Sequence, residues 1–276
     1  MVFKSNMLTI STSKFHSPSF GMYFNDVNDV KGELKYRGDT RLCRDDLDFP
    51  AVVNFLEKKY KDVPKVNVVM HACSDGEEVY SFLGVLISKL GEKAAKFLPV
   101  CAKDIDSNHL KLAKRGVYNI SRSEYKLANS NMNGDFYTYF EPMPKRGSSD
   151  PRLKYTTTVK AEHSLKSLIN FAQGNILEDI KNTDLKNTVL FARNFWPYLS
   201  KDEIGRLVDL LAKNTDASST VIIGDYDKEY GIDKLLKTAG FVETEVDNVF
   251  EKSKINEYKK PKSDIYKYKN FSLYNL

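Results

Sequence analysis

The chain is 276 residues long, which is enough for one large domain, or for one domain with a small appendage. Hydrophobic residues make up 41% and charged residues 29%, as in ordinary globular proteins, and the net charge of +5 permits an acidic partner without demanding nucleic acid. No apolar run reaches the roughly 18 residues that a membrane-spanning helix needs, and no apolar signal-peptide core follows Met1. We therefore expect a cytoplasmic protein without a membrane-inserted segment.

Missing motifs narrow the choice of chemistry. The three cysteines, Cys43, Cys73 and Cys101, form no CxxC pair and are interpreted as free thiols in a reducing compartment. The four histidines show no metal-ligand spacing, so no metal site is predicted. The chain has no GxGxxG, GxxxxGKS/T or GxSxG motif, which counts against a nicotinamide or flavin enzyme, a P-loop protein and an α/β-hydrolase.

The first predicted elements lie before residue 91. Residues 1–38 are polar and irregular and are predicted to form a loosely packed arm, whereas Asp46–Tyr60 has apolar residues at helical spacing. An apolar strand, Val66–Met70, leads through a polar turn into a helix that ends near Leu90. Gly76 in that turn lets the backbone bend sharply or approach a ligand closely.

Strands and helices alternate through the rest of the chain. The predicted elements are a strand at Phe97–Ala102, a helix at Ser107–Arg115, strands at Leu168–Ala172, Thr188–Ala192 and Thr220–Ile223, a helix at Lys201–Lys213, and a last helix and hairpin that end near Lys252. Residues 117–165 are the least regular part and are interpreted as a small inserted β subdomain of a main domain at 39–252. Residues 253–276 are interpreted as a lysine-rich, solvated tail.

This alternation predicts an α/β fold, with a mostly parallel sheet and helices on both faces. The polar residues of interest all follow predicted strands: Glu78, Asp104, Asn175, Arg193 and Asn194. In such sheets, ligands bind where the carboxyl ends of the strands meet. The sequence therefore predicts one site for a nucleoside-type cofactor at that edge.

Several of these residues also have a structural interpretation. Asp104 is suited to bind ribose hydroxyls or to cap the next helix, and Asp106 allows both roles to be filled. Of Glu77 and Glu78, one is suited to face a ligand's amino group while the other faces solvent, although such pairs more often complement the helix dipole. Arg193 needs an anion or carbonyl partner, either in a ligand or in a structural salt bridge.

Five segments, in order, resemble the CheR family of chemoreceptor glutamate methyltransferases, which use S-adenosylmethionine. They are Thr40–Asp45 (family T-x-F-F-R-D/E), Cys73–Ser81 (C-S-x-G-E-E-P-Y-S), Lys103–Tyr118 (S-D-I-D-x-x-x-L-x-x-A-x-x-G-x-Y), Ile169–Leu177 (a strand ending in N-L) and Leu190–Asp202 (I-F-C-R-N-V-x-I-Y-F). The resemblance implies a Rossmann-like class I methyltransferase fold with a seven-stranded sheet. The helical N-terminal domain usual in the family is not recognisable in the residues before Thr40.

The resemblance also implies roles for individual residues. Glu78 would hold the methionine end of the cofactor, Asp104 its ribose, and Asn175 with the backbone of Ile176 its adenine. The full implied set of cofactor contacts is Thr40, Arg44, Glu78, Asp104, Asn175, Ile176, Arg193 and Asn194.

The implied activity is methyl transfer to a glutamate carboxylate of a protein, such as a receptor or another signalling protein. Arg44 and Tyr198 would lie near the transferring methyl group as catalytic residues. Because a glutamate carboxylate is already ionised at neutral pH, no general base is required. Two alternatives stay open: a sensor or scaffold that binds S-adenosylmethionine or S-adenosylhomocysteine without turnover and, less favoured, a nucleic-acid methyltransferase that uses the lysine-rich tail.

Overall fold

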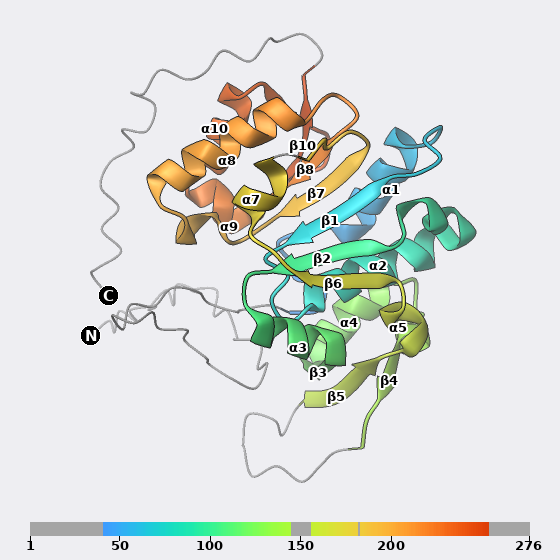
Figure 1. Cartoon of the computed structure of the whole chain (residues 1–276). Helices are drawn as coiled ribbons and strands as arrows, with labels where there is room; N and C mark the ends of the chain where they lie inside the picture. The colour runs from blue at the N-terminus through green and yellow to red at the C-terminus, as the bar shows by residue number, and fades with distance from the viewer. Residues whose placement is uncertain (1–40, 145–155, 182, 254–276) are drawn as a thin grey trace, which may run out of the picture.

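The computed structural model describes residues 41–144, 156–181 and 183–253 (Figure 1). The main sheet has seven strands in the order β6-β2-β1-β7-β8-β10-β9. Their bounds are β1 Asn67–His71, β2 Val100–Asp104, β6 Ile169–Gln173, β7 Thr188–Ala192, β8 Thr220–Ile222, β9 Phe241–Glu243 and β10 Val249–Lys252. The first five in spatial order are parallel, whereas β10 runs antiparallel to both β8 and β9. The predicted α/β fold with a mostly parallel sheet is therefore confirmed.

Helices cover both faces of this sheet (Figure 1). The described helices are α1 Phe49–Lys59, α2 Glu77–Leu90, α3 Ser107–Arg115, α4 Arg122–Asn131, α5 Phe136–Tyr139, α6 His163–Lys166, α7 Ile176–Lys181, α8 Lys201–Asn214, α9 Asp225–Glu229 and α10 Ile232–Thr238, with short 3-10 helices η1 Gly91–Phe97 and η3 Trp196–Tyr198. Within the described ranges, none of them has the length and apolar character that crossing a bilayer requires. The predicted arm at 1–38 and all of the predicted tail except Ser253 lie outside the described residues.

Strand β7 belongs to two hydrophobic clusters at once. All five of its residues are buried. Val189 and Phe191 pack in a cluster with side chains of α1 and α2, and Phe191 contacts the ring of Phe82 at a centroid distance of 4.9 Å. Leu190 and Ala192 join the cluster formed by α7, α8 and α10. Successive side chains of a strand point to opposite faces, so a continuous apolar run is what a central strand covered on both faces needs.

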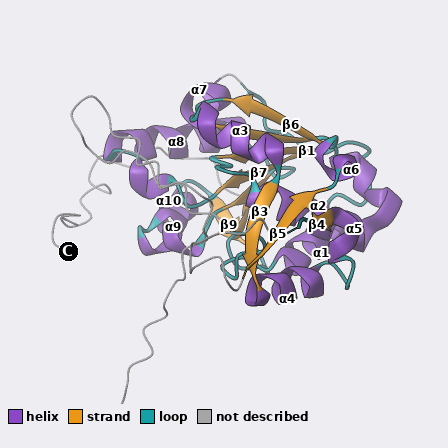
Figure 2. Ribbon diagram, turned by 90° about the horizontal axis from the view of Figure 1, so that it is seen from below, coloured by secondary structure: helices purple, strands orange, loops and turns teal. Residues whose placement is uncertain are grey.

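A second, antiparallel sheet lies beside the first, with strands β3 Val117–Ser121, β5 Thr156–Ala161 and β4 Phe140–Pro142 in the order β3-β5-β4. Figure 2 shows β3 and β5 side by side, with α4 and α5 near them. The sequence interpretation of this segment missed α4. The spacing of Ser121 and Glu124 is that of a capping box and could have indicated the start of this helix. In the structure each of the two side chains accepts a hydrogen bond from the other residue's backbone amide.

Two predicted boundaries are wrong for physical reasons. The strand predicted at Phe97–Ala102 begins only at Val100, because Phe97 ends η1 and packs its fully buried ring against Tyr60. The helix predicted to begin at Asp46 begins at Phe49 after the N-cap Asp48, whose side chain accepts a hydrogen bond from the amide of Ala51. Asp46 is thereby left in the loop that reaches the sheet edge.

Neither acid at the start of α2 faces solvent as the sequence interpretation allowed. Glu77 is only 4% exposed, and its Oε2 has no hydrogen-bond partner in the described part of the chain. Burial, reinforced by the charge of Asp75, raises the pKa of Glu77 to about 8. The carboxyl of Glu77 is therefore largely protonated in the folded protein at neutral pH.

This burial predicts a pH-dependent effect of Glu77→Gln. The folded-state pKa lies above the unfolded value of about 4.3, so ionisation of Glu77 increasingly destabilises the wild type as pH rises between the two. The free energy of unfolding of the variant should gain about 2–4 kcal/mol relative to wild type between pH 5 and pH 8. Urea unfolding at both pH values measures this gain, with Glu141→Gln on the exposed part of β4 as the control. An equal difference at both pH values would contradict the prediction.

Candidate functional site

A pocket opens where the carboxyl ends of β6, β2, β1 and β7 meet. The turn after β1 contributes Ser74, the end of β2 contributes Asp104, and the loops after β6 and β7 contribute Asn175 and Asn194. The loop before α1 closes the other side with Arg44. Parallel strands direct their carboxyl ends to one edge, so four segments far apart in sequence meet here.

The structure brings most of the predicted site residues to this pocket. Those that line it are Arg44, Glu78, Asp104, Asn175, Ile176, Asn194 and Tyr198. Arg193 does not line it, since its side chain is 1% exposed and lies behind the wall. Thr40 falls outside the described residues.

Asp104, the last residue of β2, is held by two backbone amides. Its Oδ2 accepts a hydrogen bond from the amide of Ser74 at 2.7 Å, and its Oδ1 accepts one from the amide of Asp106 at 2.9 Å. Burial raises the pKa of Asp104, and these two hydrogen bonds oppose the rise. Asp106 meanwhile caps α3 through the amide of Asn108. The two acids of Asp104-Ile105-Asp106 therefore have different roles. Asp106 caps α3, whereas Asp104 faces the pocket and retains lone pairs that can accept hydrogen bonds from a ligand.

Gly76 bends the turn that carries Ser74 to Asp104. It has a left-handed φ of 91°, and a Cβ there would lie 2.9 Å from the Cβ of Ala113 on α3. Of the two uses of Gly76 allowed by the sequence, the sharp turn is the one observed. The close approach that Gly76 permits is to α3, because Gly76 itself does not line the pocket.

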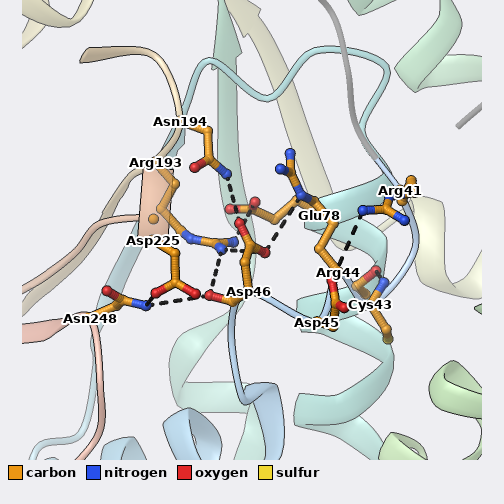
Figure 3. Close-up of polar contacts among 12 residues, drawn as sticks. Arg41, Cys43, Arg44, Asp45, Asp46, Glu78, Arg193, Asn194, Asp225 and Asn248 are labelled. Atoms are coloured by element: carbon orange, nitrogen blue, oxygen red, sulfur yellow. Dashed lines mark hydrogen bonds and ion pairs between the residues drawn. The ribbon is translucent and has the colours of Figure 1, made fainter. Parts of the chain in front are cut away.

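Arg193 is buried between two carboxylates from distant parts of the chain (Figure 3). Its Nη1 lies 2.6 Å from Oε2 of Glu78, and its Nη2 lies 2.9 Å from Oδ1 of Asp46. Its Nε donates to the carbonyl of Ile223 at 3.3 Å. The partner that Arg193 needs is thus a structural pair of acids, and the guanidinium joins the loop before α1, the start of α2 and the ends of β7 and β8.

Burial and charge act in opposite directions on these two acids. The pKa of Asp46 lies below its ordinary value, since the guanidiniums of Arg193 and Arg44 outweigh the effect of burial. For Glu78 burial raises the pKa and Arg193 opposes it. Oε1 of Glu78, unlike Oε2, has no hydrogen-bond partner among the described residues, so one oxygen of the pocket-lining carboxylate can accept a hydrogen bond from a bound group.

Asn194 has a left-handed φ of 60° that its neighbours enforce. Its backbone amide donates to Oδ2 of the fully buried Asp227 at 2.7 Å, and the amide of Gly224 donates to the same oxygen at 2.8 Å. Its Nδ2 donates to Oδ2 of Asp46 at 3.2 Å. A Cβ on Gly224 would lie only 2.0 Å from Oδ1 of Asn194, so the glycine makes room for this side chain.

The aromatic segment after Asn194 divides between core and pocket. Trp196 is fully buried and donates from its indole N–H to the carbonyl of Ala192 at 2.7 Å. Phe195 stacks on Trp196 with ring centroids 5.5 Å apart and lines the pocket. Tyr198 lines the pocket and is 37% exposed, so its ring is accessible to a second molecule.

Beyond the predicted set, four residues lie at or behind this pocket, and sequence reasoning missed three of them. Asp46 and Asp227 anchor Arg193 and Asn194, and His71 and His109 line the wall. The sequence indicates His71 as the end of a strand near the site, although it favours a core or loop histidine there. His71 ends β1 and lines the pocket, and burial lowers its pKa to about 4, so it is neutral. The other three carry no motif in the sequence. Within the described ranges, no group of three or more His, Cys, Asp or Glu side chains is arranged to hold a metal ion.

Comparisons with known proteins place the chain in a family. The family model described as the CheR methyltransferase, SAM binding domain, matches residues 39–241. Among curated proteins, Chemotaxis protein methyltransferase 2 of Pseudomonas aeruginosa is 25% identical over 197 residues, which cover 69% of this chain and 65% of that protein. Putative methyltransferase Cher3 of Pseudomonas putida is 25% identical over 190 residues, or 67% of this chain and 63% of that protein. The match thus spans under two thirds of the length of either relative.

A solved structure of magnesium protoporphyrin IX methyltransferase from Synechocystis PCC 6803 with bound SAM shares 14% identity and covers 74% of this chain and 78% of its own. Its TM-score against this chain is 0.35. The family match covers most of the described residues and all of the pocket, and its domain is one that binds S-adenosylmethionine. The chain therefore belongs to the CheR family of S-adenosylmethionine-dependent methyltransferases.

Proposed function

We propose that the protein transfers a methyl group from S-adenosylmethionine to a side-chain carboxylate of another protein, giving a glutamate methyl ester. The observation that carries this proposal is that Arg44 and Tyr198, 154 positions apart, line the same pocket as the acids Glu78 and Asp104. We place the reaction in the cytoplasm and its acceptor among receptors or other signalling proteins. The unpaired Cys43, Cys73 and Cys101 are compatible with that compartment.

The residues present fit the cofactor that the family binds. Carboxylates are suited to ribose hydroxyls and to an ammonium group, and Asp104 and Glu78 each present such a group to the pocket. Asn175 lines the side next to β6, where its Oδ1 accepts from the amide of Leu177 at 2.9 Å and fixes the start of α7. We assign the ribose to Asp104, the methionine end to Glu78 and the adenine to Asn175 and Ile176.

Arg44 suits an anionic acceptor. It is the one Lys or Arg side chain among the described residues that line the pocket. Its Nε lies 3.5 Å from Oδ1 of Asp46, which holds the guanidinium at the pocket wall. An arginine fork matches a carboxylate bidentately, so Arg44 is placed to orient an incoming glutamate while Tyr198 supplies a phenol beside it.

The chemistry needs no proton transfer by the protein. Bound S-adenosylmethionine supplies a methyl group on a positively charged sulfur, and its transfer to an ionised carboxylate leaves a neutral thioether and a methyl ester. The protein's task is therefore to position two reactants and exclude water from them. Neutral His71 and the protonated Glu77 have no part in such a step.

Asp104→Asn tests the cofactor assignment. Loss of the carboxylate should weaken binding of both S-adenosylmethionine and S-adenosylhomocysteine by about 10- to 100-fold, because hydrogen bonds to a charged acceptor are lost. Isothermal titration calorimetry measures both affinities. Asp48→Ser keeps the cap of α1 at a residue that does not line the pocket, and this variant should bind as wild type does. Unchanged affinity in Asp104→Asn would remove Asp104 from the site.

Arg44→Ala and Tyr198→Phe test catalysis against mere binding. Methyl transfer should fall by about 10- to 100-fold in Arg44→Ala and by about 10-fold in Tyr198→Phe, with cofactor affinity changed much less. The assay uses tritiated S-adenosylmethionine with an extract of the source organism as acceptor, and counts the methanol that base releases from methyl esters. Base-stable label would exclude a carboxylate acceptor. A wild type that binds cofactor and labels nothing would favour the sensor or scaffold alternative.

Arg193→Met tests the support of Glu78. With the guanidinium removed, Glu78 loses its ion-pair partner and Asp46 keeps only Arg44, so the free energy of unfolding should fall by about 3–5 kcal/mol. Urea unfolding measures the loss. The matched control is Lys93→Met, which breaks the exposed Lys93–Glu57 pair and should cost at most about 1 kcal/mol. Equal effects of the two variants would mean that Arg193 is not the anchor described above.

A further inference from the structure

His109 and Asp75 form a pair at the pocket wall that none of the roles above uses. Nδ1 of His109 lies 2.6 Å from Oδ1 of Asp75. His109 is in the first turn of α3 and lines the pocket, and Asp75 is buried in the turn between β1 and α2. Both positions are unspecified in the motifs C-S-x-G-E-E-P-Y-S and S-D-I-D-x-x-x-L, so the pair is a feature of this chain's own residues.

The contact with Asp75 uses only one nitrogen of the ring. An imidazole nitrogen this close to a carboxylate carries the proton, so Nδ1 donates to Asp75. Nε2 has no hydrogen-bond partner among the described residues, and it is not among their buried unpartnered atoms. Because His109 lines the pocket, Nε2 is the nitrogen left for a ligand.

Four acidic side chains, from four segments, surround this ring, and Glu77 among them is the one that is largely protonated at neutral pH. They are Asp75 in the turn, Asp104 at the end of β2, Asp106 at the start of α3, and Glu77 at the start of α2. The hydrogen bond with Asp75 raises the pKa of His109, burial opposes this, and the charges of Asp75, Asp104 and Asp106 raise it further. These interactions favour the imidazolium form more than in a free histidine, and in that form Nε2 is a donor.

We propose that His109 donates a hydrogen bond from Nε2 to a ribose hydroxyl of the cofactor, and that Asp75 positions its ring. His109 lines the pocket together with Asp104, to which we assign the ribose, and the charge of its ring acts on the Asp104 carboxylate. A ribose hydroxyl both donates and accepts, so it can donate to Asp104 and accept from His109 together. The proposal rests on the cofactor assignment and not on the identity of the methyl acceptor.

Two substitutions of His109 separate the two ring nitrogens. The amide nitrogen of asparagine lies about where Nδ1 lies, so His109→Asn keeps the contact with Asp75 and removes the donor to the pocket. The longer glutamine places its amide about where Nε2 lies, so His109→Gln restores a neutral donor. The control is His163→Gln. His163 is exposed on α6 and does not line the pocket.

The first measurement is calorimetry at pH 6.5 with S-adenosylhomocysteine and with methylthioadenosine, which has the ribose and adenine but no amino acid. His109→Asn should weaken binding of both ligands by the same factor, about 10-fold, and His109→Gln by less. A loss for S-adenosylhomocysteine alone would assign His109 to the methionine carboxylate and overturn the proposal. Full affinity of His109→Asn for both ligands would overturn it as well.

The role of Asp75 is read from a pH profile. Wild-type affinity for methylthioadenosine should fall as pH rises through the pKa of His109, because Nε2 loses its proton. Asp75→Asn removes the neighbouring charge and should move this fall to lower pH, whereas a merely structural role would change affinity without moving it. A pH-independent affinity in wild type would contradict the imidazolium donor.

These binding results are independent of methyl transfer. If no acceptor is ever labelled, the expected loss of affinity in His109→Asn still supports the ribose contact. If wild type binds neither ligand, the cofactor pocket itself fails and the role of His109 fails with it.

Discussion

The burial of one positive charge organises this site. The guanidinium of Arg193 has lost almost all contact with water, and a charge in that state persists only beside opposite charges. Its two carboxylate partners lie 147 and 115 positions away in the chain. The loop before α1 must therefore close on the ends of β7 and α2. Arg44 lies two residues before Asp46 in that loop. The ion pair between Asp46 and the buried Arg193 therefore helps to fix the position of Arg44, the residue that we assign to the acceptor.

Backbone amides orient two further acids of the site, Asp104 and Asp227. Asp104 accepts hydrogen bonds from the amides of Ser74 and Asp106. One carboxylate oxygen of Asp227 accepts hydrogen bonds from the amides of both Asn194 and Gly224. Asp104 ends strand β2, whereas Asp227 lies in helix α9 and accepts from the N–H groups of segments that follow β7 and β8. Such carboxylates have little rotational freedom left, so a ligand meets groups that are already aligned and loses less entropy on binding.

The sheet and the positions of its strand-end residues could be predicted from the sequence, because both depend on local patterns. Apolar runs such as Thr188–Ala192 identify central strands, and the polar residue after each run marks the ligand edge. The partners of Arg193 could not be predicted, because they depend on which distant segments meet. Asp46 was even assigned to a helix, since apolar spacing before Tyr60 does not reveal that Asp48 is the cap. Likewise Glu77 and Glu78 are adjacent acids with the same local signal, and only the packing of α2 gives them different environments.

The double burial of β7 has a thermodynamic consequence. The side chains of β7 belong alternately to the two hydrophobic clusters, so neither cluster can stay intact without this strand. The two clusters should therefore unfold together. Arg193 and Asn194 follow this strand directly, and the pocket therefore exists only while both clusters are intact. Linkage then makes the cofactor a stabiliser of the whole sheet, by about 2.7 kcal/mol when its free concentration is 100 times its Kd. The lifetime of the folded chain in a cell would thus follow the cell's supply of activated methyl groups.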